Sequence, residues 1–91
     1  MPTLRIVNSP MNRATYDATI ARMDLDHVHP LGLIMHGATE VDGHMLIAQV
    51  WDSEEYLRKY TEERLNPALD ALGQSLDFDS TVFELEHLVT P

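Results

Sequence analysis

The sequence predicts a small α+β domain in which four antiparallel strands form one sheet and two helices cover one of its faces. Segments of strand-like and helix-like pattern follow each other in the order strand, helix, strand, strand, helix, strand. Asp42 and Gly43 separate the two middle strands, and Asp-Gly is a strong signal for a tight hairpin. The chain has 91 residues, which leaves room for a single domain.

The first half of the chain predicts a strand and a helix. Residues 3–8 are short, apolar and partly β-branched, as in a strand. Ser9 is suited to cap the following helix, and Pro10 to its first turn, where a missing N–H costs nothing. An apolar face of helical period then runs to residue 23 and comprises Ala14, Ala18 and Ala21, with Tyr16, Ile20 and Met23 beside them. A polar connection ends before Pro30.

The second half predicts a hairpin, an interrupted helix and a last strand. Residues 31–40 and 44–51 are the two hairpin strands, and 80–89 the last strand. Asp52 or Ser53 caps the second helix, and Asp52 with Glu55 fits a reciprocal capping pair. Its buried stripe comprises Leu57, Tyr60, Leu65, Ala68, Leu69 and Leu72. We expect Pro67 to kink this helix near Arg64 or to split it, and Gly73 to end it.

This order of elements is the split β-α-β arrangement known as ferredoxin-like. We find no second unit, so residues 1–91 are interpreted as one ferredoxin-like domain.

Composition excludes several classes of function. The formal net charge is −9 with only 6 Lys and Arg, so nucleic acid and anionic membranes would be repelled. The chain has no cysteine, which excludes disulfides and thiolate metal sites. No apolar run approaches the roughly 20 residues of a membrane span, and no secretory leader is recognisable. We therefore expect a cytoplasmic protein without nucleic-acid or membrane partners.

His36 lies in the middle of an otherwise apolar strand and is the main functional candidate. With a two-residue turn, His36 lies opposite Gln49, and directly opposed residues share a face of the sheet. One face then carries Leu33, Met35, Gly37, Leu46, Ala48 and Val50, and the other Ile34, His36, Ala38, Met45, Ile47, Gln49 and Trp51. We expect the helices to cover the first face.

The face of His36 is too apolar to be exposed to water, so we expect a second copy of the chain to cover it. Two facing sheets would enclose a space into which His36, Gln49 and Trp51 project. An apolar space with few polar groups is the usual form of a small-molecule site. The expected partners are therefore a second copy, bound through the sheet face, and a small apolar or aromatic molecule.

Residues 32–38 (GLIMHGA), the hairpin, the segment VWDSEEYLRKYTEERLNPAL and the short last strand resemble the dimeric α+β barrel superfamily. Within it they are most similar to the antibiotic biosynthesis monooxygenase-like group. The resemblance implies a homodimer with a ligand pocket in each half. Its members include cofactor-independent oxygenases of polyketide anthrones, polyketide cyclases, isomerases and haem-degrading enzymes. Asn, Trp or His often line the pocket of the oxygenases, and Asn8, Trp51 and His36 are of those types.

Each candidate residue has a functional and a structural interpretation. His36 is the candidate catalytic residue, as a general base or as a hydrogen-bond donor to a substrate oxygen; alternatively it is a buried histidine satisfied by Gln49 or by the partner chain. Trp51 and Tyr60 could line the pocket or pack in the core. The candidate substrate-binding residues are Trp51, Gln49, Ile34, Asn8, His29 and Tyr60. His27 and His29 lack a third ligand of defined spacing, so we predict no metal site.

Three functions stay open. The first is an enzyme without metal or organic cofactor, an oxygenase or a cyclase/isomerase acting on an aromatic or polyketide-like molecule. The second is a non-catalytic binding or structural module. The third, weaker, is haem binding with His36 or His29 as axial ligand.

Overall fold

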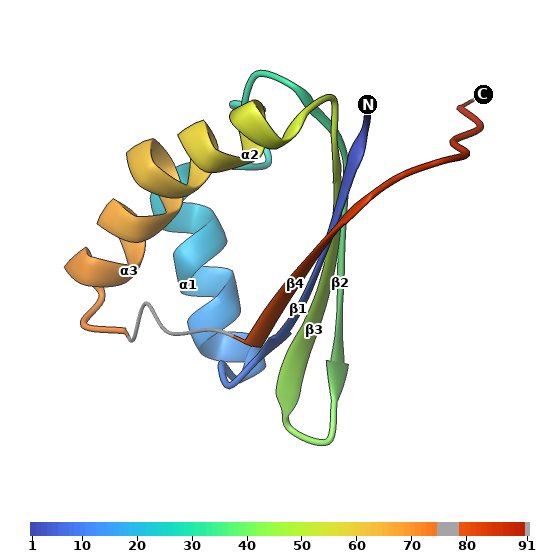
Figure 1. The fold of residues 1–91 in the computed structure, drawn as a ribbon. Coiled ribbons are helices and arrows are strands. Elements are labelled where there is room, and N and C mark those ends of the chain that lie inside the picture. Colours follow the sequence, from blue (N-terminus) through green and yellow to red (C-terminus); the bar gives the residue numbers. More distant parts are fainter. Residues whose placement is uncertain (75–78, 91) are drawn as a thin grey trace.

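The computed structural model describes residues 1–74 and 79–90. Four antiparallel strands form one sheet in the order β2-β3-β1-β4. All helices lie on one side of this sheet (Figure 1). The elements are β1 (Thr3–Ser9), α1 (Arg13–Met23), β2 (Leu33–Val41), β3 (His44–Trp51), α2 (Glu54–Tyr60), the π-helical turn η1 (Thr61–Leu65), α3 (Asn66–Ala71) and β4 (Asp79–Glu84). The predicted ferredoxin-like fold is confirmed.

Helix α1 begins later than the sequence predicted. Its N-cap is Asn12, whose side chain accepts a hydrogen bond of 2.8 Å from the Thr15 N–H. Ser9 cannot cap the helix because it is still paired in the sheet, opposite Met45. The buried face of α1 is also narrower than predicted: Thr19 and Met23 are buried, and the alanines 14, 18 and 21 are exposed.

The second helix is interrupted just before Pro67, as we expected from this proline. The turn η1 precedes Pro67, which lies in the first turn of α3. Gly73 ends α3 with φ +68°, and the next N–H returns 2.8 Å to the Leu69 carbonyl. The expected capping pair at Asp52 does not form, since Ser53 is the N-cap and makes no side-chain capping bond.

The predicted hairpin register is confirmed, but the assignment of its faces is wrong. Asp42 and Gly43 form the two-residue turn, both at positive φ, and His36 pairs with Gln49. The face of His36 packs against the helices of the same chain, with Met45, Ile47, Gln49 and Trp51 buried. A β-bulge between Leu33 and Met35 takes Ile34 out of register and leaves Leu33 opposite Trp51.

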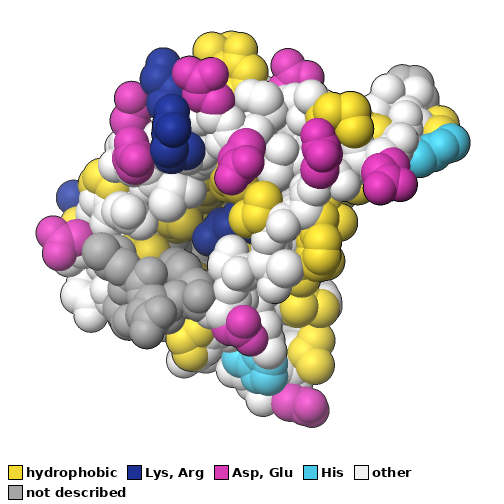
Figure 2. All heavy atoms as spheres, viewed as in Figure 1, with side chains coloured by type: hydrophobic (Ala, Val, Ile, Leu, Met, Phe, Trp, Pro, Cys, Tyr) yellow, Lys and Arg dark blue, Asp and Glu magenta, His cyan; other side chains and the backbone are white. Residues whose placement is uncertain are grey.

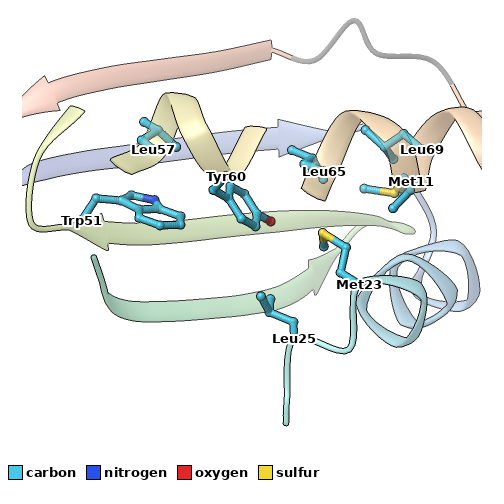
Figure 3. Close-up of a cluster of buried hydrophobic side chains, with 9 residues drawn as sticks. Met11, Met23, Leu25, Trp51, Leu57, Tyr60, Leu65 and Leu69 are labelled. Carbon is cyan, nitrogen blue, oxygen red and sulfur yellow. The ribbon is translucent and has the colours of Figure 1, made fainter. Parts of the chain in front are cut away.

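The main core lies between the helices and one end of the sheet (Figure 3). Trp51 is fully buried there, and its ring centroid lies 4.9 Å from that of Tyr60. The remaining buried members are Met11, Met23, Leu25, Leu57, Leu65, Ala68 and Leu69. Arg64 also donates a hydrogen bond to the Met23 carbonyl, which ties η1 to the end of α1.

The opposite face of the sheet is open and apolar. Figure 2 shows hydrophobic side chains along this side of the molecule. Ile6, Met35, Leu46 and Phe83 are between 38% and 49% exposed. Strand β4 ends at Glu84 rather than at the predicted residue 89, and the described chain after it leaves the sheet (Figure 1). Among the described residues, no helix is long and apolar enough to cross a membrane.

Candidate functional site

A chain of hydrogen bonds surrounds His36 between the sheet and α1. The Tyr16 hydroxyl, on α1, lies 2.7 Å from His36 Nε2, and the Gln49 side-chain nitrogen lies 3.0 Å from His36 Nδ1. On its other side, the Gln49 oxygen accepts bonds from Trp51 Nε1 at 3.1 Å and from Arg5 Nη1 at 3.4 Å. Strands β1, β2 and β3 and helix α1 thus each place a polar group in one layer.

This network fixes the tautomer of His36. The Trp51 indole and the Arg5 guanidinium can only donate, so the Gln49 group facing them must be its carbonyl oxygen. The Gln49 NH₂ group therefore faces His36 and donates to Nδ1. His36 then carries its proton on Nε2, from which it donates to the Tyr16 oxygen.

His36 is held in its neutral form. Burial lowers the pKa of His36 below its ordinary value; the carboxylate of Asp26 opposes this shift, and the Arg5 cation adds to it. A second proton on Nδ1 would also face the Gln49 NH₂ group, where both would be donors. His36 is therefore a hydrogen-bond donor at neutral pH, not an imidazolium ion.

Tyr16 ends this chain of donors. Burial raises the pKa of Tyr16 to about 12, so its hydroxyl keeps its proton at neutral pH. Because the Tyr16 oxygen accepts from His36, its own proton must point at a further acceptor. No group of the described residues takes that position, so a water or a ligand oxygen can accept from Tyr16.

A small cavity lies next to this chain. Its volume is about 20 Å³, which is enough for about one water molecule and too small for a substrate. Tyr16, His36 and Gln49 contribute polar groups to its wall. The apolar part of the wall includes Met11, Ile20, Met23, Ile47 and Leu65.

On the other side of His36 lies a groove of about 250 Å³ at the edge of the sheet. It is lined by Leu25, Asp26, His29, Leu33, Ile34, Met35 and His36, and we call it the edge groove. Among the described residues, His36 is the one that lines both the edge groove and the inner cavity. The imidazole therefore separates a surface depression from the interior.

The structure brings together some of the predicted site residues and not others. His36, Gln49 and Tyr60 line the inner cavity, and His29 and Ile34 line the edge groove with His36. Trp51 lies in the core behind Gln49 and reaches neither space. Asn8 is exposed on the open face of the sheet, away from His36.

Two residues of the network were missed from the sequence. Tyr16 shares a helical face with Ile20 and Met23, and this spacing indicates that its side chain faces the sheet. Arg5 alternates with Val7 along β1 and is therefore on the buried side.

Metal binding gains no support in the described part of the chain. His27 Nδ1 lies 2.7 Å from the Asp24 carboxylate, but both side chains are exposed. No group of three or more potential ligands lies close enough together to hold an ion among the residues searched.

Comparison with solved structures identifies the fold. Rv0793 of Mycobacterium tuberculosis superposes with a TM-score of 0.74 at 14% identity, over 99% of this chain and 100% of that one. A protein of Deinococcus radiodurans assigned to the antibiotic biosynthesis monooxygenases gives 0.69 at 18% identity, over 100% and 98%. This chain has the fold of the antibiotic biosynthesis monooxygenases.

The antibiotic biosynthesis monooxygenase fold also includes SnoaB, a cofactor-independent oxygenase of Streptomyces nogalater, with a TM-score of 0.65 at 14% identity, over 99% of this chain and 96% of that one. No family model matches the sequence, and the comparison with curated proteins gives no match either. At such low identity the likeness concerns the fold.

The burial of His36 predicts a pH dependence of stability. The folded pKa lies below the value near 6.5 of the unfolded chain, so in a pH window that begins near pH 7 and extends down to the folded pKa the unfolded chain binds more protons. The contribution of His36 is fully present above this window and is lost as the pH falls through it. We expect the free energy of unfolding to fall less steeply on acidification in His36→Gln than in the parent, as measured by denaturant titration at several pH values.

The carboxylates also titrate at acid pH, so the comparison needs a matched histidine. His87 is exposed beyond β4, and His87→Gln should reproduce the slope of the parent. Parallel slopes for the parent and for His36→Gln would show that the folded environment does not disfavour protonation of His36.

Proposed function

We propose that this protein binds a small aromatic or polyketide-like molecule beside Tyr16 and His36 and acts on it without a metal or an organic cofactor. The observation that carries this proposal is the direction of the hydrogen-bond chain. Gln49 donates to His36, His36 to Tyr16, and Tyr16 has a proton left to donate into an apolar space. A chain of donors that ends in this way is suited to donate a hydrogen bond to a carbonyl or phenol oxygen of a ligand.

The chemistry that follows from this arrangement is stabilisation of negative charge on that oxygen. Hydrogen bonds in series polarise one another, so the Tyr16 proton becomes a stronger donor as charge develops. A ligand that loses its proton to water and is held as an enolate or phenolate by this donor could rearrange, as in a cyclase or isomerase, or react with molecular oxygen, as in an oxygenase. SnoaB, which shares the fold, is a cofactor-independent oxygenase, and this favours the reaction with oxygen over the rearrangement.

Binding requires the helix layer to open, because the inner cavity holds about one water. Met11 and Met23 line this cavity, and unbranched methionine side chains adapt readily to a ligand, so their rearrangement can make room for it.

Tyr16→Phe tests this role while keeping the ring. Trp51, the single tryptophan, reports binding of an anthrone through its fluorescence, and oxygen uptake reports turnover. We expect Tyr16→Phe to bind the anthrone nearly as the parent does and to lose turnover by about 100-fold, as when one oxyanion donor is removed. His36→Ala should abolish turnover as well.

The matched control is Tyr56→Phe, because Tyr56 lies on α2 and makes no part of the hydrogen-bond chain. It should keep both binding and turnover. Equal turnover in the parent and in Tyr16→Phe would refute the proposed donor. The absence of saturable binding to any aromatic probe would refute the ligand site itself.

The second candidate is a non-catalytic module, in which the same groups only complete a polar core. Two observations favour it: both nitrogens of His36 already have protein partners, and the cavity has room for about one water molecule. It predicts that His36→Leu is at least as stable as the parent, whereas a ligand site predicts loss of binding. The same bonded nitrogens weigh against His36 as a haem ligand.

We also propose that two copies associate through the open face of the sheet. This face exposes apolar side chains from neighbouring strands, including Ile6, Met35, Leu46 and Phe83. Contiguous apolar surface of this kind is characteristic of protein interfaces. The His36 side of the sheet, which we first expected at the interface, is covered by the chain's own helices.

Ile6→Glu should convert the dimer to a monomer, as measured by sedimentation. Ile6 lies on β1, inside the sheet, and a charge there would be buried without a partner in the dimer but exposed in the monomer. Val28→Glu is the control, since Val28 is an equally apolar but more exposed loop residue. A monomeric parent, or a dimer that survives Ile6→Glu, would contradict this assembly.

A further inference from the structure

Arg5 is a buried cation whose partners are both neutral. Its side chain is 8% exposed. Nε donates to the Ser80 hydroxyl at 3.1 Å, and Nη1 to the Gln49 oxygen at 3.4 Å. Among residues 1–74 and 79–90 no carboxylate forms an ion pair with it, and Nη2 makes no hydrogen bond. Buried arginines are normally paired with a negative group, and none of the residues that the structure describes supplies one to Arg5.

A cleft of about 700 Å³ reaches this guanidinium from solvent. It lies between α2 and η1 on one side and β4 on the other, and we call it the β4 cleft. Figure 2 shows a basic side chain at the bottom of a hollow between the helices and the sheet. Arg5 lines both the β4 cleft and the inner cavity, and Leu57 and Val82 supply apolar wall. The volume is within the usual range for ligand sites.

We propose that Arg5 binds the carboxylate of a small molecule whose apolar body lies in the β4 cleft. The guanidinium fork matches the two oxygens of a planar carboxylate. Binding would supply the negative charge that the described residues do not supply. The ligand would lie in the β4 cleft rather than in the space beside Tyr16 and His36, so the inference does not depend on the proposed function.

The charge around the cleft favours an anion with one negative charge. Glu54, Glu55 and Glu62 line it, against the single outer cation Arg58. These carboxylates would repel a phosphate dianion more strongly than a carboxylate. The acidic surroundings thus select for a monocarboxylate with an apolar group, such as an aromatic acid.

An occupied site should be detectable at His36. Gln49 bonds to both Arg5 and His36, and the Arg5 cation is one of the groups that lower the pKa of His36. A bound carboxylate would neutralise that cation. The pKa of His36 should therefore rise when the β4 cleft is occupied.

Benzoate and its neutral isostere benzamide form the test. Titrated into the full chain and followed by NMR, benzoate should bind saturably, shift the amides of Ser80 and Val82, and raise the pKa of His36. Benzamide should bind at least about 10-fold more weakly, because it lacks the charge-assisted bonds. Equal affinities, no saturation, or shifts that leave Ser80 and Val82 unmoved would overturn the proposal.

Two arginine variants separate the buried cation from the exposed one. Arg5→Met keeps the length of the side chain and should abolish benzoate binding, whereas Arg58→Met, at the exposed cation of the same cleft, should retain it. Loss of binding in Arg58→Met alone would overturn the assignment. Should Arg5→Met fail to fold, the decision falls to the parent protein: a benzoate-dependent rise in the pKa of His36 supports Arg5, and an unchanged pKa refutes it.

Discussion

Gln49→Leu is expected to lower the free energy of unfolding by about 3–4 kcal/mol, because it leaves several buried groups without partners at once. Gln49 is 2% exposed. Its oxygen accepts from the Trp51 indole and from Arg5, and its nitrogen donates to His36. Leucine has a similar volume, so the loss comes from the missing hydrogen bonds rather than from a cavity. Urea denaturation of both proteins at neutral pH measures it.

Gln49→Glu separates the two halves of this amide. A glutamate keeps the acceptor for Trp51 and Arg5, and it pairs the Arg5 cation with a charge. It cannot donate to His36, so His36 must donate from Nδ1 instead, and the neighbouring carboxylate favours a second proton on the ring. We expect a smaller loss of stability than in Gln49→Leu, and a pKa of His36 above that of the parent.

The direction of that pKa shift is the sharper observation. In the parent, burial lowers the pKa of His36, so stability is lost as the pH falls. In Gln49→Glu, a folded pKa of His36 above the unfolded value would reverse the sign of the pH dependence of stability. Stability would then be gained below the unfolded pKa and lost as the pH rises through the folded pKa. An unchanged pKa in Gln49→Glu would mean that Gln49 does not face His36 with its nitrogen.

The hairpin shows how far sequence reasoning reaches in this fold. Its turn residues set the register, and the pairing of His36 with Gln49 followed from counting alone. Counting does not say which face the helices cover. Both faces of β2 and β3 are mainly apolar, so the decision depends on the residues of β1 and of the helices that meet them.

Strand β1 contained the missing information. Thr3, Arg5, Val7 and Ser9 alternate on the buried side, whereas Ile6 and Asn8 face outward. An arginine, a serine and a threonine beside a valine do not look like a buried face, because polar side chains are normally exposed. They are buried here because Arg5 bonds to Gln49 and Ser80, and Ser9 accepts from the Met11 N–H. Such long-range partners are not visible in a local pattern.

The candidate site was predictable in its centre and not in its surroundings. His36 stood out as one imidazole in an apolar strand, and its bond to Gln49 was anticipated. Tyr16 comes from a helix 20 positions away in the sequence, and no spacing rule links it to β2. The bulge at Ile34 was also unforeseen, although it places that residue in the edge groove.

Gly32→Ala is expected to destabilise the protein by about 3 kcal/mol or more, from two causes that add. Gly32 has φ +86°, where a side chain is strained, and a Cβ atom there would lie 2.3 Å from Cγ of Tyr56. Neither the backbone at Gly32 nor the side chain of Tyr56 can move away easily. The Gly32 carbonyl accepts a 2.7 Å bond from the Asp52 N–H, and Tyr56 packs against the main core.

Two other glycines divide this effect into its parts. Gly43 has φ +82° with open space around it, so Gly43→Ala should show the backbone strain alone, about 1–2 kcal/mol. Gly37 has neither a positive φ nor a close neighbour, and Gly37→Ala should change little. Thermal and urea unfolding of the three variants give the comparison. The difference between the stability losses of Gly32→Ala and Gly43→Ala measures the cost of the contact with Tyr56. Equal losses would mean that α2 shifts to accommodate the new Cβ atom and that the contact adds no cost.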